Sequence, residues 1–326
     1  MDTDEARRAT LRRVRVAVVD IGTNSTRLLV ADVDGDGAQA RVAAEIDRRT
    51  VVTRLGQDVD ATGRLADEAV DRVVAVLADY RAAIDHHGAQ RTVAVLTSAV
   101  RDAANGPAFT RRVRDEFGLD AHTIPGAEEA RLTFLGATSE RPAGAPEPVV
   151  VIDVGGGSTE FVVGENGEPV FHVSTQSGAV RQSERHLRSD PPAPAELEAM
   201  RAQVRSIVES EVPAAVRART RAAIAVAGTA TSLAAIDQKL EPYDPARVHG
   251  YVLTLERAQE ALATLAEMTD AERREVPGLE PARAPTIVAG AMHLVEALRA
   301  FSLDSTEVSE HDILRGAALE AVHRVP

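Results

Sequence analysis

Between residues 16 and 124, short apolar runs of strand length alternate with longer segments of helical period. Residues 16–20 (VAVVD) are rich in β-branched side chains, which is typical of a strand buried on both faces. In residues 65–87 the apolar positions recur at spacings of three and four, which indicates a long amphipathic helix. We therefore predict strands over 16–20, 28–32, 42–53, 93–96 and 121–124, and helices over 65–87 and 107–117.

The same kind of pattern begins again after residue 127. A helix is predicted over 128–138, and the Pro- and Gly-rich stretch 139–148 (SERPAGAPEP) fits a surface loop. Residues 149–153 (VVVID) favour another buried strand, with a return strand over 160–163 and a turn over 165–168. A strand at 223–228 (AIAVAG) precedes a further helix, and a last helix is predicted over 286–298.

The two parts of the chain share a sequence segment. Residues 18–28 (VVDIGTNSTRL) match residues 151–161 (VIDVGGGSTEF) at a constant offset of 133, and Asp, Gly, Ser and Thr recur in register. Such internal similarity indicates duplication of one supersecondary unit. We therefore predict an α/β fold in which two similar lobes face each other across a cleft.

Composition and charge exclude several kinds of chemistry. The 326 residues include no Cys, so a disulfide framework, a thiolate metal site and a Cys nucleophile are excluded. Lys239 is the only lysine and lies outside any G-x-x-x-x-G-K-[ST] loop, which excludes a Walker A NTPase. A net charge of −13 disfavours nucleic acid and membrane surfaces as partners. No stretch approaches about 18 uninterrupted apolar residues, and residues 1–15 lack an apolar signal core, so we expect a cytoplasmic protein.

Each duplicated strand ends in Asp and is followed by glycine and small hydroxyl residues. Backbone N–H groups in such a turn surround phosphate oxygens, and Ser and Thr hydroxyls add further donors. The carboxylates repel phosphate, so we expect them to bind the Mg²⁺ that neutralises it. The predicted phosphate-binding residues are Gly22, Thr23, Asn24, Ser25, Gly155, Gly156, Gly157, Ser158 and Thr159, with Gly228 and Thr229 from a third loop; the predicted metal ligands are Asp20, Asp153 and Glu160.

These paired loops resemble the phosphate loops of the acetate kinase, sugar kinase and actin superfamily. More specifically, the chain is similar to the exopolyphosphatase and guanosine pentaphosphatase (Ppx/GppA) family. The resemblance is carried by residues 20–25 (DIGTNS), 97–105 (TSAVRDAAN), 126–131 (GAEEAR), 153–160 (DVGGGSTE), 227–229 (AGT), 248–250 (VHG) and 314–316 (LRG). It implies two RNase H-like lobes: residues 1–126 with segment 308–326 packing back on them, and residues 127–307.

The resemblance also implies roles for individual side chains. Glu129 takes the place of the group that orients or deprotonates the attacking water, whereas Glu128 is read as an acidic residue in the first turn of a helix. Arg101 and Arg283 are expected to bind phosphate, and Arg27 is either a further phosphate ligand or a surface arginine. His249 and His311 lack metal-ligand spacing and are expected to serve structural hydrogen bonds.

The resulting hypothesis is a Mg²⁺-dependent phosphatase that removes orthophosphate from the end of inorganic polyphosphate, or alternatively from guanosine pentaphosphate. Two other hypotheses stay open at this stage, a kinase of the same superfamily and a nucleotide-sensing protein without catalysis. Longer family members carry an additional helical region, which this chain lacks after Pro326. We therefore expect a short form of the family, for which the choice between the two substrates stays open. The resemblance further suggests a homodimer.

Overall fold

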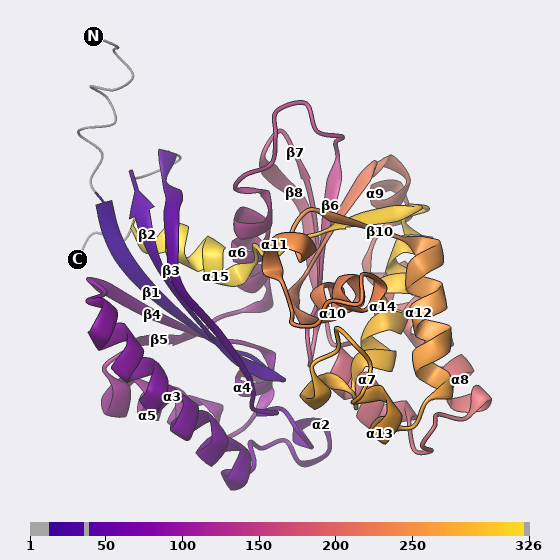
Figure 1. Ribbon diagram of the computed structural model, residues 1–326, viewed down its shortest axis with the longest axis horizontal. Helices are drawn as coiled ribbons and strands as arrows, with labels where there is room; N and C mark the ends of the chain where they lie inside the picture. The colour runs from indigo at the N-terminus through magenta and orange to yellow at the C-terminus, as the bar shows by residue number, and fades with distance from the viewer. Residues whose placement is uncertain (1–12, 36–38, 323–326) are drawn as a thin grey trace.

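Residues 13–35 and 39–322 are described by the computed structural model, in which two α/β lobes lie side by side (Figure 1). The first lobe contains a five-stranded sheet in the order β3-β2-β1-β4-β5. Its strands are β1 (Arg13–Ile21), β2 (Ser25–Asp34), β3 (Arg41–Val52), β4 (Arg91–Leu96) and β5 (Asp120–Thr123), and its helices are α2 (Val59–Thr62), α3 (Asp67–His87), α4 (Ser98–Asp102) and α5 (Gly106–Phe117).

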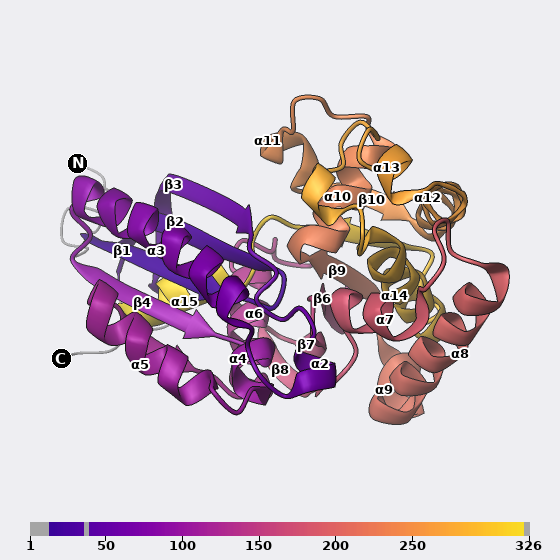
Figure 2. The same cartoon turned by 90° about the horizontal axis from the view of Figure 1, so that it is seen from below.

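Strand β1 is buried on both faces, as its unbroken apolar run predicts. Ala17, Val19 and Ile21 pack in the cluster formed with α3 and α5. Val16 and Val18 point to the opposite face and pack against α15 (Ile313–Ala321). Figure 2 shows the same arrangement, with α3 and α5 on one side of the sheet and α15 on the other. The C-terminal helix therefore completes the core of the first lobe.

The second lobe contains a six-stranded sheet in the order β10-β11-β9-β6-β7-β8. Its strands are β6 (Val149–Val154), β7 (Thr159–Glu165), β8 (Glu168–Thr175), β9 (Ala222–Val226), β10 (Tyr251–Thr254) and β11 (Ser305–Val308). Its helices are α6 (Gly126–Thr138), α7 (Ala179–His186), α8 (Pro194–Glu211), α9 (Ala214–Arg219), α10 (Ala227–Asp237), α11 (Pro245–Val248), α12 (Leu255–Glu267), α13 (Asp270–Arg273) and α14 (Ile287–Ala300), with a 3₁₀ turn η2 (Pro281–Arg283).

The duplication seen in the sequence is also a duplication of sheet topology. The order β3-β2-β1-β4-β5 of the first sheet is repeated as β8-β7-β6-β9-β11 in the second. The pairing registers correspond as well, because Asp20 pairs with Arg27 and Asp153 pairs with Glu160 at the ends of equivalent hairpins. The predicted α/β fold with two similar lobes is confirmed.

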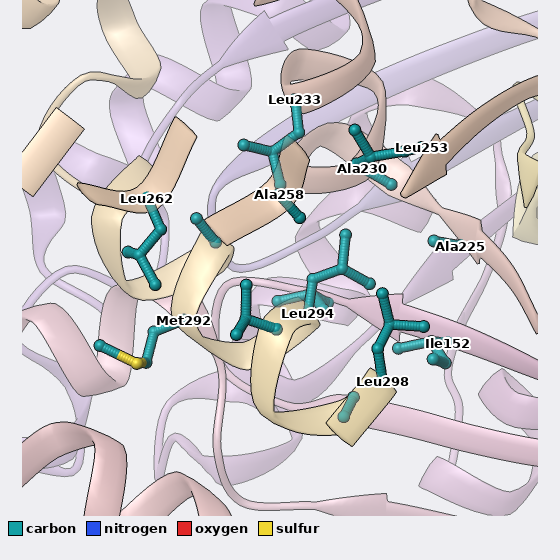
Figure 3. Close-up of a cluster of buried hydrophobic side chains, with 14 of the residues drawn as sticks. Ile152, Ala225, Ala230, Leu233, Leu253, Ala258, Leu262, Met292, Leu294 and Leu298 are labelled. Carbon is teal, nitrogen blue, oxygen red and sulfur yellow. The ribbon is translucent and has the colours of Figure 1, made fainter. Parts of the chain in front are cut away.

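Helix α14 forms the centre of the second core. Twelve of its residues are buried, including the polar His293 and Glu296, because other elements surround the helix. In Figure 3, Met292, Leu294 and Leu298 of this helix lie among side chains from β6, β9, α10 and α12. The cores contain mostly Ala, Val, Leu and Ile, which suits a chain with three Tyr, six Phe and no Trp.

Helices α6 and α15 connect the two lobes. Ala130 and Phe134 of α6 pack on the second sheet, whereas α15 packs on the first. The two helices cross closely at Gly136 and Gly316, where a Cβ on Gly136 would lie 1.9 Å from the Asp312 carbonyl oxygen. The lobe limits at residues 126 and 307 remain a prediction, and residues 1–12 and 323–326 lie outside the described part of the chain.

Every strand and helix predicted above has a counterpart in the structure, with end positions that differ by a few residues. Two local details differ. Residues 98–102, for which no helix or strand was predicted, form the short helix α4, and Gly228 and Thr229 belong to the first turn of α10 rather than to a loop. Among the described helices, none has the length and apolar character needed to cross a bilayer.

Candidate active site

The two glycine-containing turns meet at the cleft between the lobes. The first glycine loop (residues 22–25) follows β1, and the second glycine loop (residues 155–158) follows β6. A Cβ on Gly157 would lie 2.2 Å from Ser98 Oγ, and one on Gly156 would lie 3.0 Å from Thr23 Cβ. The second loop therefore approaches the first lobe so closely that a side chain at Gly157 would displace Ser98 or Thr23, and one at Gly156 would be in tight contact with Thr23.

Between the loops lies a cavity of about 90 Å³, the inner cavity. Most residues predicted from the sequence line it: Asp20, Gly22, Thr23, Asn24, Ser25, Arg27, Glu129, Asp153, Gly155, Gly156, Gly157, Ser158, Glu160, Gly228, Thr229 and Arg283. Two predicted residues lie elsewhere. Thr159 is buried and donates its hydroxyl to the Ser177 carbonyl, and Arg101 contacts Glu129.

Four carboxyl groups are buried at the inner cavity. Asp20, Glu129, Asp153 and Glu160 are each less than 9% exposed. Burial raises the pKa of Glu129 to about 7 and that of Asp153 to about 7, and it raises the pKa of Glu160 well above its ordinary value. Like charges on neighbouring carboxylates act in the same direction, so the cluster favours binding of protons or a cation.

The donor set of this cluster is suited to a hard divalent cation. It offers carboxylate oxygens only, the ligands that Mg²⁺ prefers. Asp20 is bound by Arg27 through Oδ2, while its Oδ1 is buried without a hydrogen-bond partner. Glu160 accepts a hydrogen bond from Ser174 Oγ at 2.7 Å through Oε1. Since a buried oxygen without a partner is costly, Oδ1 of Asp20 is available to accept a hydrogen bond or to bind a cation.

Arg27 is not a solvent-exposed surface arginine. Its Nε donates to Asp20 Oδ2 at 2.8 Å, and its Nη1 contacts Asp312, the N-cap residue of α15. Its side chain is 15% exposed and lines the inner cavity. A role of Arg27 in phosphate binding remains a prediction, but all three of its guanidinium nitrogens already donate to carboxylates, which joins β1, β2 and α15.

Glu129 lies in the first turn of α6, beside α4 of the first lobe. Arg101 Nη1 donates to Glu129 Oε2 at 3.0 Å and to the Ile124 carbonyl at 3.1 Å. Glu128 points away and forms a bidentate ion pair with Arg131, at 2.9 and 2.8 Å. The structure thus separates the two adjacent glutamates, one facing the inner cavity and one facing the surface.

Arg283 lies directly against the backbone of Gly228. A Cβ on Gly228 would lie 1.9 Å from Arg283 Nη1, so the guanidinium occupies the space that any side chain would need. Arg283 is paired with Glu280 at 3.3 Å, and its exposed fraction is 17%. Glycine at position 228 therefore determines where this cation sits.

His249, His311 and Glu140 come together away from the cleft, with the two imidazole rings 4.2 Å apart. Arg315 donates to His311 Nε2, and the backbone N–H of Glu310 donates to His249 Nδ1. His249 Nδ1 and His311 Nε2 therefore act as hydrogen-bond acceptors, which fixes the orientation of both rings. These hydrogen bonds agree with the structural role expected for both residues.

Comparison with known proteins identifies the family. Residues 29–324 match the model of the Ppx/GppA phosphatase family. The chain belongs to this family. It is 41% identical over 314 residues to exopolyphosphatase 2 of Mycobacterium tuberculosis, an alignment that covers 94% of this chain and 98% of that protein.

Solved Ppx/GppA structures share the fold. The crystal structure of the Aquifex aeolicus family member matches with a TM-score of 0.78 and 32% identity, covering 95% of this chain and 98% of that one. An exopolyphosphatase from Cytophaga hutchinsonii matches with a TM-score of 0.85 and 25% identity, covering 94% and 97%. The predicted family and its phosphatase character are confirmed.

This Ppx/GppA protein also has a second, larger hollow of about 770 Å³, the outer pocket, next to the inner cavity. Arg27, Gly228 and Arg283 line both spaces. The rest of the outer pocket combines apolar and aromatic side chains with several carboxylates and two arginines; it includes Leu240, Glu241, Tyr243, Glu275, Val276, Leu279, Glu280, Glu310, Arg48 and Arg274. The inner cavity therefore opens toward a space that is not predominantly basic.

The sequence interpretation missed some residues at the inner cavity. Thr97 and Ser98 line it, and Ser98 Oγ lies 3.0 Å from Thr23 Oγ1. Both belong to the motif 97–105, so their hydroxyls were a usable signal. Asp312 had no such signal, because its contact with Arg27 joins residues 285 positions apart.

Proposed function

We propose that this Ppx/GppA protein is an exopolyphosphatase that hydrolyses the terminal phosphoanhydride of inorganic polyphosphate, with Glu129 positioning and activating the attacking water. One observation carries the proposal: the Glu129 carboxylate is buried in the same small cavity as both glycine loops. The name of the M. tuberculosis relative supports the choice of substrate.

The two glycine loops would bind the terminal phosphoryl group from opposite sides. Their backbone N–H groups and the hydroxyls of Thr23, Ser25 and Ser158 supply donors, and Arg283 supplies a cation at the exit of the cavity. Hydrolysis of a phosphoanhydride depends mainly on positioning and charge stabilisation. A protein with a net charge of −13 can bind a polyanion this way, because the charge is needed only locally.

Asp20, Asp153 and Glu160 would hold the metal ion, which we propose to be Mg²⁺. When bound, it neutralises phosphate oxygens and so lowers the cost of bringing the polyanion beside buried carboxylates. The oxygen-only donor set and the unpartnered Oδ1 of Asp20 support this assignment.

In the proposed step, a water oxygen attacks the terminal phosphorus and the bond from that phosphorus to the bridging oxygen breaks. Glu129 accepts a proton from the water, orthophosphate leaves, and the polymer is shorter by one phosphate. Arg101 fixes one Glu129 oxygen, Oε2, and we assign the other oxygen, Oε1, to the water. The ionised form of Glu129 is the active one.

Guanosine pentaphosphate is the second candidate substrate, and the outer pocket favours it. That space of about 770 Å³ adjoins the phosphate-binding residues and offers Tyr243, Leu279 and several carboxylates. Apolar surface and carboxylates suit an uncharged heterocycle with N–H donors, while Arg48 and Arg274 of the same lining can pair with phosphate groups.

The deciding experiment measures orthophosphate release from short polyphosphate, long polyphosphate and guanosine pentaphosphate, with and without Mg²⁺. Metal-dependent release from polyphosphate without an acceptor supports the proposal, whereas release only from guanosine pentaphosphate selects the second candidate. Transfer of phosphate from ATP to an acceptor would identify a kinase, and binding without turnover would identify a sensor. The predicted homodimer is tested separately by sedimentation, and the cytoplasmic location by cell fractionation.

A further inference from the structure

Arg181 of α7 contacts both lobes, and these contacts have no role in the reaction proposed above. Its Nε donates to the Gly157 carbonyl at 2.9 Å, within its own lobe. Its Nη2 donates to Asp102 Oδ2 at 2.8 Å, and its Nη1 contacts Asp60. Asp60 lies in α2 and Asp102 ends α4, so one guanidinium joins the second glycine loop to two helices of the opposite lobe.

The start of α7 holds the rest of this loop. The N–H groups of Ala179 and Val180 donate to the carbonyls of Gly155 and Gly156, each at 2.8 Å. A Cβ on Gly178 would lie 2.4 Å from the Gly156 carbonyl oxygen, so the backbones are in direct contact. Arg181 adds the Gly157 carbonyl to this set, which makes it the side chain that anchors the tip of the loop.

Other contacts across the cleft lack this connection to the loop. Arg185 pairs with Asp60 at 2.6 Å from a side chain that is 39% exposed. Glu184 accepts a hydrogen bond from the Asp58 N–H at 3.2 Å. Arg181 is only 12% exposed and combines the contact across the cleft with the contact to Gly157.

We infer that Arg181 is a positioning residue that couples closure of the two lobes to placement of the second glycine loop. Closure brings Asp60 and Asp102 to the guanidinium, and the fixed guanidinium then holds the Gly157 peptide. The planar guanidinium of Arg181 donates hydrogen bonds to three partners that lie in different directions. The ammonium group of a lysine does not present donors in this arrangement. The inference rests on the proposed function, because it assigns the second loop to the terminal phosphoryl group.

Arg181→Ala and Arg181→Lys test the inference, with Arg185→Ala as the matched control. We expect both Arg181 variants to lower kcat for tripolyphosphate with Mg²⁺ by about tenfold or more. Arg185→Ala is expected to stay within about twofold, since it removes only an exposed ion pair. Equal loss in Arg181→Ala and Arg185→Ala, or full activity in both Arg181 variants, would overturn the inference.

A double-mutant cycle separates coupling from lost stability. Asp102→Ala leaves the Gly157 contact in place, yet it should reproduce most of the kcat loss of Arg181→Ala, and the double variant should be no worse than Arg181→Ala alone. Rates are normalised to folded protein by thermal unfolding. Additive losses would show that the two residues act independently and would contradict the inference.

A measurement that requires no catalysis tests the inference independently of the proposed function. The chain has no Cys, so Asp79→Cys in α3 and Glu209→Cys in α8 allow one spin-label pair across the lobes. In ligand-free protein, Arg181→Ala should shift the label distances to longer values, and Arg185→Ala should shift them less. An unchanged distribution in Arg181→Ala overturns the inference, whether or not the wild-type protein hydrolyses polyphosphate.

Discussion

Arg101 Nη1 lies 3.0 Å from Glu129 Oε2, and this contact joins the end of α4 in the first lobe to the first turn of α6. The ion pair opposes the effect of burial, because the positive charge of Arg101 lowers the pKa of Glu129 while burial raises it. Arg101 can therefore act on the reaction through the protonation state of Glu129 without contacting phosphate.

Arg101→Ala is expected to raise the pKa of Glu129 further. A larger fraction of Glu129 is then protonated at neutral pH, so the acidic limb of the pH–rate profile should shift upward by about one unit, and the rate near pH 7 should fall about fivefold. Activity should recover at higher pH. If Arg101 binds phosphate instead, kcat/KM should fall equally at all pH values and the limb should not move.

Glu129→Gln is expected to lower phosphate release from polyphosphate by at least about a hundredfold, because the amide accepts no proton from water. Binding of tripolyphosphate, measured by calorimetry, should stay close to wild type. Glu128→Gln is the control, since Glu128 is adjacent in sequence but pairs with Arg131. Comparable activity in Glu129→Gln and Glu128→Gln would exclude the role proposed for Glu129.

Short-range sequence patterns predicted the two lobes and most residues of the inner cavity. The repeat of Asp20 to Arg27 at Asp153 to Glu160 was sufficient for the two glycine loops and their acidic residues, because each copy forms one hairpin with its loop. The roles expected for Glu129 and Arg283 came from the family resemblance instead. Helix α4 was missed, since five residues are too few for a helical period to appear.

Long-range contacts set the limit of prediction from this sequence. Asp312 and Arg27 are joined by tertiary packing of α15 on the first sheet. The outer pocket combines segments as distant as Arg48, Tyr243 and Leu279, which no local pattern connects. Exclusion of solvent from Glu129, which raises its pKa, likewise depends on neighbours from both lobes.

Mg²⁺ is expected to stabilise the protein more at pH 8 than at pH 6. With folded-state pKa values of about 7 for Glu129 and Asp153, against ordinary values of 4.5 and 3.8, the metal-free folded state binds protons that the unfolded chain does not. Its free energy of unfolding should therefore rise as pH falls from above 7 toward 5. Protons compete with the cation, so the increase in melting temperature on adding Mg²⁺ should shrink over the same range.

Asp153→Asn is the control for that measurement. It removes one carboxylate of the proposed site, so the increase in melting temperature caused by Mg²⁺ should largely disappear, and metal-free Asp153→Asn should be at least as stable as wild type at pH 8. A melting temperature that responds to Mg²⁺ equally in both proteins would place the cation elsewhere.

Gly228→Ala should displace Arg283. The new Cβ would lie 1.9 Å from Nη1, and the guanidinium can move because it ends a flexible side chain. We expect kcat/KM for tripolyphosphate to fall about tenfold, or ~1.4 kcal/mol of transition-state stabilisation, with little change in melting temperature. If the effect acts through Arg283, Gly228→Ala combined with Arg283→Ala should be no worse than Arg283→Ala alone. Additive losses would assign the effect to another contact of Gly228.

The close crossing of α6 and α15 at Gly136 and Gly316 has a mechanical consequence. The chain passes from the first sheet to the second between β5 and α6, and it returns between β11 and α15. Because both connections lie beside this helix crossing, we expect the lobes to rotate relative to each other about an axis through the crossing. The same connections oppose sliding of one lobe along the other. A protein cut once at either connection should still remain a single particle, because α15 packs on the first sheet and crosses α6 in direct backbone contact.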